Sequence, residues 1–197
     1  AYAAAHTDGL LEKESELVTM AQLFMQREVP YKAATLLESE MEKGIVAKNA
    51  KNYRLLSQAW MLSQEDTKAI PALKEAARMS NDGELDVRLG NSYLNLGEYS
   101  ECVTAVRNGL RKGGLKNPDN AQISLGMCLY NLKQYSEARA AFRDAARTER
   151  SRRVANQWIQ VIDADVSRNE SIRDAQQAAE RKQKEVEARR AKTERAL

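Results

Sequence analysis

The chain has 197 residues, of which 30% are charged and 6% aromatic, with only three prolines and nine glycines, a composition typical of an all-helical protein. Its 31 basic and 28 acidic side chains are interspersed and leave a formal net charge of +3, which argues against a nucleic-acid binder. No run of about 18 apolar residues is present, so the sequence predicts no membrane-spanning helix.

The chain begins with a short segment of small and polar residues. Residues 1–9, AYAAAHTDG, predict a flexible lead-in rather than a folded element. Because the first residue is Ala and not Met, we expect a processed form from which any signal peptide has been removed.

Residues 10–150 repeat one helix-turn-helix pattern. It is clearest in RLGNSYLNLGEYSECVTAV from Arg88 and SLGMCLYNLKQYSEARAAF from Ser124, and it extends back through YRLLSQAWMLSQEDTKAIPALKEAA and ELVTMAQLFMQREVPYKAATLLESE. One small residue recurs in each unit at intervals of 36, 33 and 36 residues, namely Ala21, Ser57, Gly90 and Gly126. A repeat of this length predicts a stack of helix pairs, each of which buries its apolar face against the next.

Small and large apolar residues alternate at fixed places in the repeat. Small residues are expected where two helices approach closely, and large ones where they fill the core. We therefore predict close helix contacts at Gly90 and Gly126. The predicted core residues of the two clearest units are Leu89, Tyr93, Leu125 and Phe142.

An insertion, RKGGLKNPDN, separates the third unit from the fourth. Gly113 and Gly114 are predicted to end one helix, and Pro118 to begin the next.

The repeated residues give the chain a resemblance to the tetratricopeptide repeat family over residues 10–150. The family pattern is W-x2-L-G-x2-Y, then A-x3-F, then P. The chain departs from it in lacking the closing Pro and the Trp, for which Tyr53 is the nearest counterpart. The resemblance implies an all-α, right-handed α-solenoid of about four helix pairs.

After residue 150 the pattern changes. Residues 151–167 place Val154, Trp158, Ile162 and Val166 at four-residue steps, which predicts a helix with one apolar stripe that caps the stack and is anchored by Trp158. Residues 168–197 have almost no large apolar residues and predict a charged helical tail.

The residue types that catalyse reactions or bind metals do not form any known motif here. We therefore predict no enzyme activity, no cofactor and no metal. The single histidine, His6, leaves no Ser-His or Cys-His pair, and no phosphate loop, nucleophile elbow or zinc motif is present. We interpret Cys102 and Cys128 as small buried hydrophobic residues, with a disulfide as the alternative that sequence alone leaves open.

The family resemblance implies a groove lined by the first helix of each pair, able to hold a peptide or a helix of a partner protein. The family's groove positions fall on Val18, Gln22, Met25, Gln26, Arg54, Gln58, Met61, Leu62, Val87, Asn91, Leu94, Asn95, Ile123, Met127, Tyr130 and Asn131. The carboxylate clamp of the family's co-chaperones is incomplete, because Gln58, Val87, Asn120 and Ser124 occupy several of its places.

The layout of four repeats followed by VANQWIQVIDADVSRNESIRDAQQAAE resembles bacterial tetratricopeptide proteins found with TonB, ExbB and ExbD energy-transduction components. That resemblance implies a periplasmic scaffold that assists TonB-dependent iron uptake through protein contacts; a cytoplasmic location is the alternative. The alternative function is structural assembly, in which the charged C-terminal helix forms an oligomer or docks on a partner. The absence of sustained apolar heptads after Ala178 counts against it.

Overall fold

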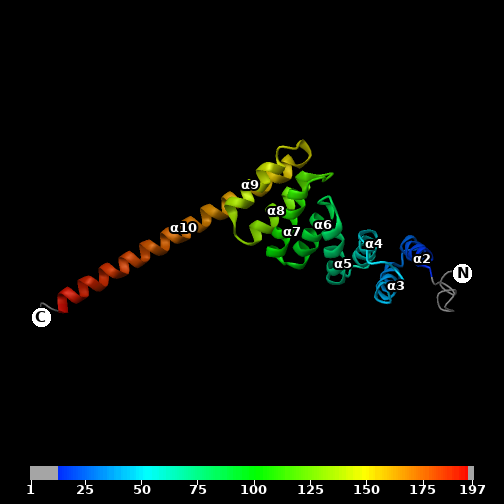
Figure 1. Cartoon of the computed structure of the whole chain (residues 1–197). Coiled ribbons are helices and arrows are strands. Elements are labelled where there is room, and N and C mark those ends of the chain that lie inside the picture. Colours follow the sequence, from blue (N-terminus) through cyan, green and yellow to red (C-terminus); the bar gives the residue numbers. More distant parts are fainter. Residues whose placement is uncertain (1–12, 195–197) are drawn as a thin grey trace.

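The computed structural model describes residues 13–194, and it describes side chains through residue 187. Within that range the chain forms nine α-helices: α2 (Glu14–Gln26), α3 (Pro30–Glu42), α4 (Ala50–Leu62), α5 (Asp66–Met79), α6 (Glu84–Leu96), α7 (Tyr99–Lys112), α8 (Pro118–Asn131), α9 (Tyr135–Ala145) and α10 (Glu149–Glu194). The first eight make four pairs that stack in chain order, and α10 projects from the end of the stack (Figure 1). This confirms the predicted all-α solenoid of four helix pairs.

The same tight turn closes each of the four pairs. One or two positions after the first helix, every pair has a residue with a positive φ between 59° and 78°: Glu28, Gln64, Gly97 and Lys133. The next amide then donates to a carbonyl five residues earlier, in Val29 to Phe24, Glu65 to Trp60, Glu98 to Tyr93 and Gln134 to Leu129. This is the wider of the two hydrogen bonds of a Schellman helix end. Because the first pair has the same turn as the other three, it belongs to the repeat. Glycine occupies the position of positive φ only in the third pair.

The predicted close contacts are present where the two helices of a pair cross. A Cβ built on Gly90 would lie 2.3 Å from Val106 Cγ2, and one on Gly126 would lie 2.7 Å from Phe142 Cζ. The side chains predicted to fill the core around them, Leu89, Tyr93, Leu125 and Phe142, are all buried. The insertion also folds as predicted, because α7 ends just before Gly113, whose φ is 72°, and α8 begins at Pro118.

A disulfide joins the third pair to the fourth. Cys102 on α7 and Cys128 on α8 are fully buried, with their Cα atoms 6.2 Å apart. Of the two possibilities that the sequence left open, the structure shows the disulfide, and the predicted burial of both residues is confirmed. The residues are distant in sequence, and only the stacking of α8 against α7 brings them within bonding range.

The predicted cap and tail lie on one continuous helix. The N-terminal part of α10 packs on α8 and α9, with Ala155 and Ile162 buried and Trp158 stacked on Phe142 at 5.5 Å between ring centroids. Val154 was predicted to share this stripe, but its side chain is 42% exposed. The prediction failed there because strict four-residue steps drift around a helix with 3.6 residues per turn. From residue 167 to residue 187 every described side chain is exposed.

We expect Gly126→Leu to destabilise the fold by about 1–3 kcal/mol, because the new side chain must displace the Phe142 ring. Urea unfolding followed by circular dichroism measures the loss. Ala140→Leu, at an exposed position of α9, is the matched control and should leave the midpoint nearly unchanged. Equal stability of the Gly126 variant and the wild type would contradict the close helix crossing.

We expect the double substitution Cys102→Ala and Cys128→Ala to lower the free energy of unfolding by about 2–4 kcal/mol, since the bond closes a chain segment with a sequence separation of 26. Urea unfolding of the variant and the wild type, with and without a reductant, measures the difference. A wild type whose unfolding midpoint does not respond to complete reduction would show that the bond contributes nothing to stability.

Candidate protein-binding surface

The four first helices, α2, α4, α6 and α8, carry all sixteen residues predicted to line a groove, and we call the surface they form the first-helix face. Half of the sixteen side chains are exposed: Gln22, Gln26, Arg54, Gln58, Leu62, Asn91, Asn95 and Asn131. Seven are half-buried: Met25, Met61, Val87, Leu94, Ile123, Met127 and Tyr130. Val18 is buried at 8% exposure and belongs to the core of the first two pairs. The structure therefore gathers the set on one face of the stack, with amides at the surface and apolar side chains partly beneath them.

A pocket of about 270 Å³ opens on this face between α4 and α6. Two predicted groove residues, Arg54 and Gln58, line one side of it. Arg88 on α6 and Lys116 in the loop before α8 line the other side, and sequence reasoning missed both. Lys116 reaches the pocket only because the insertion between the third and fourth units folds back over α6, a path that the repeat pattern does not encode.

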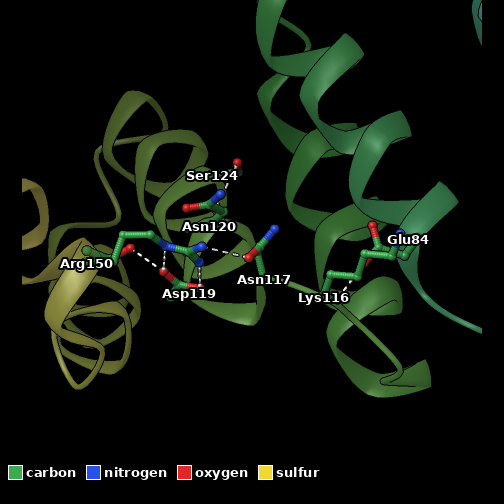
Figure 2. Close-up of polar contacts among 8 residues, drawn as sticks. Glu84, Lys116, Asn117, Asp119, Asn120, Ser124 and Arg150 are labelled. Carbon is green, nitrogen blue, oxygen red and sulfur yellow. Dashed lines mark hydrogen bonds and ion pairs between the residues drawn. The ribbon is translucent and has the colours of Figure 1, made fainter.

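The cations of the pocket lack acidic partners among the described residues. Arg54, Arg88 and Lys116 form no salt bridge there, and the two carboxylates that also line the pocket, Asp82 and Glu84, accept from backbone amides. Glu84 Oε1 accepts from the Lys116 amide at 2.6 Å, and Asp82 Oδ1 accepts from the Glu84 amide at 3.1 Å. Figure 2 shows Glu84 and Lys116 side by side at this edge. The pocket can therefore offer three guanidinium or ammonium groups to an acidic group from outside.

Tyr130 has a structural role that differs from the other predicted groove residues. Its hydroxyl donates to Asp165 Oδ2 on α10 at 2.6 Å, and its ring lies edge-on to Trp158 with centroids 5.3 Å apart. This hydrogen bond to Asp165, together with burial, raises the pKa of the Tyr130 phenol. The residue fastens α10 to α8 at the end of the first-helix face.

A second polar contact between α8 and α10 lies at their N-terminal ends (Figure 2). The buried Asp119 accepts from Arg150 Nη2 at 2.6 Å and from the Ser151 hydroxyl, and Arg150 Nη1 also donates to Asn117 Oδ1 at 2.8 Å. The hydrogen bonds from Arg150 and Ser151 lower the pKa of Asp119 to about 2. Together with the Tyr130 contact, this cluster fixes the direction in which α10 leaves the stack.

A larger pocket, of about 740 Å³, lies between the second helices α5 and α7. Its charged side chains are largely paired with one another: Lys112 bonds Asp86 and the Ala77 carbonyl, both at 2.7 Å, and Arg78 bonds Glu75 at 2.8 Å. This internal pairing leaves fewer groups for a ligand than the pocket on the first-helix face.

The described part of the chain carries no cluster of three or more His, Cys, Asp or Glu residues that could hold a metal ion. None of its helices is both long and apolar enough to cross a membrane. His6 lies outside the described residues.

Comparisons with known proteins support the repeat assignment. Residues 119–151 match the family model described as tetratricopeptide repeat. YrrB, whose structure is described as a TPR protein with an unusual peptide-binding site, is 18% identical over 85% of this chain and 84% of its own, with a TM-score of 0.67. MamA is 21% identical over 77% of this chain and 86% of its own, with a TM-score of 0.63.

A third solved structure, PilW, is described as a widely conserved type IV pilus biogenesis factor. It is 15% identical over 76% of this chain and 74% of its own, with a TM-score of 0.53. The search of curated proteins found no match. At these identities the structures establish the fold, and with the family model they support the tetratricopeptide repeat family.

We expect Asp119→Asn to destabilise the fold by about 1–3 kcal/mol at neutral pH, because Arg150 and Ser151 lose their charged acceptor. The pKa of Asp119 lies below its ordinary value of 3.8 in the folded chain, so its contribution is complete above about pH 4 and is lost as the pH falls toward 2. Urea midpoints of wild type and variant between pH 7 and pH 2 should therefore converge at the acidic end. A difference that stays constant down to pH 2 would contradict the pKa shift.

Proposed function

We propose that this chain is a non-enzymatic scaffold whose first-helix face binds a segment of another protein. The observation that carries the proposal is the pocket between α4 and α6, where Arg54, Arg88 and Lys116 converge without acidic partners among the described residues. Cations held in a depression are matched by a carboxylate of the ligand, either an acidic side chain or a chain terminus.

The surroundings of the pocket favour an extended or helical segment over a small molecule. Asn91 and Asn95 are exposed on α6 beside it, and their amides can bond a peptide backbone. Half-buried Met61 and Leu94 supply adaptable apolar contacts along the same face. YrrB, described as a TPR protein with an unusual peptide-binding site, shows that this fold can carry such a site.

We propose further that the partner belongs to the cell envelope and that the chain works in the periplasm as an accessory of a TonB-dependent iron-uptake system. Two points support this. The buried Cys102–Cys128 disulfide is typical of proteins that fold in an oxidising compartment. The order of four repeats, capping segment and charged helix resembles tetratricopeptide proteins found with TonB-system components.

The proposal predicts that Arg54→Glu with Arg88→Glu abolishes capture of the partner, with a loss of affinity of at least about tenfold, because two cations of the pocket become anions. The measurement is a pull-down from envelope extract with the purified chain as bait, followed by titration of the captured protein. Lys74→Glu with Arg111→Glu, which makes the same change in net charge between α5 and α7, is the matched control.

Capture by wild type and control but not by the pocket variant supports the first-helix face, and a captured TonB-system protein supports the envelope role. Equal capture by all three chains would place the contact elsewhere. Loss in the control alone would assign it to the pocket between the second helices.

A further inference from the structure

The exposed side of α10 carries an apolar stripe that continues past the end of the stack. Four large apolar side chains, Val154, Val161, Ile172 and Val186, are each 42–50% exposed. Ala175 and Ala179 lie between the last two, and the six residues follow one another at steps of seven, eleven, three, four and seven. Such steps keep them on one side of a helix. The stripe is roughly 48 Å long at 1.5 Å per residue.

This stripe is distinct from the face that packs on α8 and α9. The packing face contains Ala155 and Ile162, and at 100° per residue it continues into the charged side of the projecting helix, which carries Arg173, Glu180 and Lys184. The apolar stripe instead joins the two exposed valines beside the stack to the two exposed residues beyond it. Packing of α10 on α8 and α9 therefore does not explain the apolar stripe.

Several exposed positions beside the stripe are polar or small: Gln157, Ala164, Asn169, Ser171, Gln176, Ala178 and Gln183. Lys182 and Glu187 also lie beside it, and Arg168 lies within it. The small neutral positions allow a second helix to approach closely.

We propose that this stripe binds the same stripe of a second copy of the chain, with the two α10 helices antiparallel. One register sets Val161 against the partner's Val186, and Ile172 against the partner's Ala175. In that register Asp165, which also accepts from the Tyr130 hydroxyl and pairs with Arg168 at 3.4 Å, lies opposite the partner's Lys182. Arg168 lies opposite the small side chain of the partner's Ala179. Each contact occurs twice by symmetry, so the helix is complementary to itself in charge as well as in size.

The polar residues within the stripe decide between the two orientations. A parallel, in-register pair would place Asp165, Arg168 and Lys182 each against its own copy, so that like charges face one another at three levels. The antiparallel register replaces the repulsions at Asp165 and at Lys182 with two opposite-charge contacts, and it sets Arg168 against Ala179.

The stack leaves room for the second helix at the place the register requires. α10 packs on the fourth pair as the first helix of a further pair would, and within the described residues no second helix covers Val161. The distal half of the partner's α10 takes that place.

The full chain should therefore have twice the mass of one chain in light scattering after size exclusion, and Val186→Glu should halve that mass at the same concentration. Val186 is 49% exposed, so the variant should keep its helix content. Gln177→Glu, on the opposite side of the same helix, is the matched control and should remain dimeric. A monomeric wild type, or a dimer that survives Val186→Glu, overturns the proposal.

Cysteine crosslinking tests the orientation, because both native cysteines are consumed by the Cys102–Cys128 bond. Under mild oxidation, a mixture of Val161→Cys and Val186→Cys chains should give a covalent dimer, whereas each variant alone should not. Covalent dimers of either variant alone would indicate a parallel pair and overturn the antiparallel register. Crosslinking between Val161→Cys and Gln177→Cys chains would show contact without register and would also overturn it.

Dimerisation rests on a different surface from the proposed capture of a partner. The Arg54→Glu and Arg88→Glu variant should remain a dimer, and the Val186→Glu monomer should still capture a partner in a single-site assay. Failure of one proposal is thus distinguishable from failure of the other.

Discussion

The close crossing of the two helices in each pair is the constraint on which the rest of the molecule depends. At Gly90 and Gly126 the facing side chain occupies the space that a Cβ would need, so the two helices approach as far as their backbones permit. A pair this thin cannot enclose its own apolar side chains, and each must cover the next. One face of the stack is therefore made of first helices alone, which is what brings Arg54 and Arg88 from separate repeats to the same pocket.

Apolar contacts alone do not specify how far one helix pair is shifted along the next. Buried polar groups specify that position. Asn52 donates to Glu14 at 2.7 Å and to the Ala47 carbonyl at 2.9 Å, which ties α4 to α2. Lys112 ties α7 to α5 and α6 in the same manner, and Asp119 with Arg150 ties α10 to α8. A hydrogen bond forms only at one relative position of two helices, and leaving a buried polar group unpaired costs free energy. Each contact between pairs therefore has one preferred geometry. The disulfide adds a covalent constraint at the joint between α7 and α8.

The repeat could be predicted from the sequence because stacking imposes the same local requirement four times. Small residues recur at the crossings and large residues in the core, and Pro118 and Gly113 mark helix ends by backbone chemistry that acts within a few residues. The Cys102–Cys128 bond and the reach of Lys116 over α6 were not predictable in this way. Each depends on how one pair lies against another, and no single repeat contains that information. The groove positions were predictable only in part. The repeat places them on one face, but the neighbouring helices determine how far each side chain is buried.

The two proposed surfaces would reinforce each other through geometry. In the antiparallel register the regions of α10 that carry the two stacks lie at opposite ends of the helix pair, separated along it by roughly 48 Å at 1.5 Å per residue. A partner with two copies of the bound segment, or a partner that is itself oligomeric, would then engage both first-helix faces at once. The second contact would form at an effective concentration set by this spacing, so that modest affinity at each pocket yields strong overall binding. A rigid charged helix suits that purpose better than a flexible linker, because it holds the two sites at a fixed separation and carries its charges on the side away from the pairing stripe.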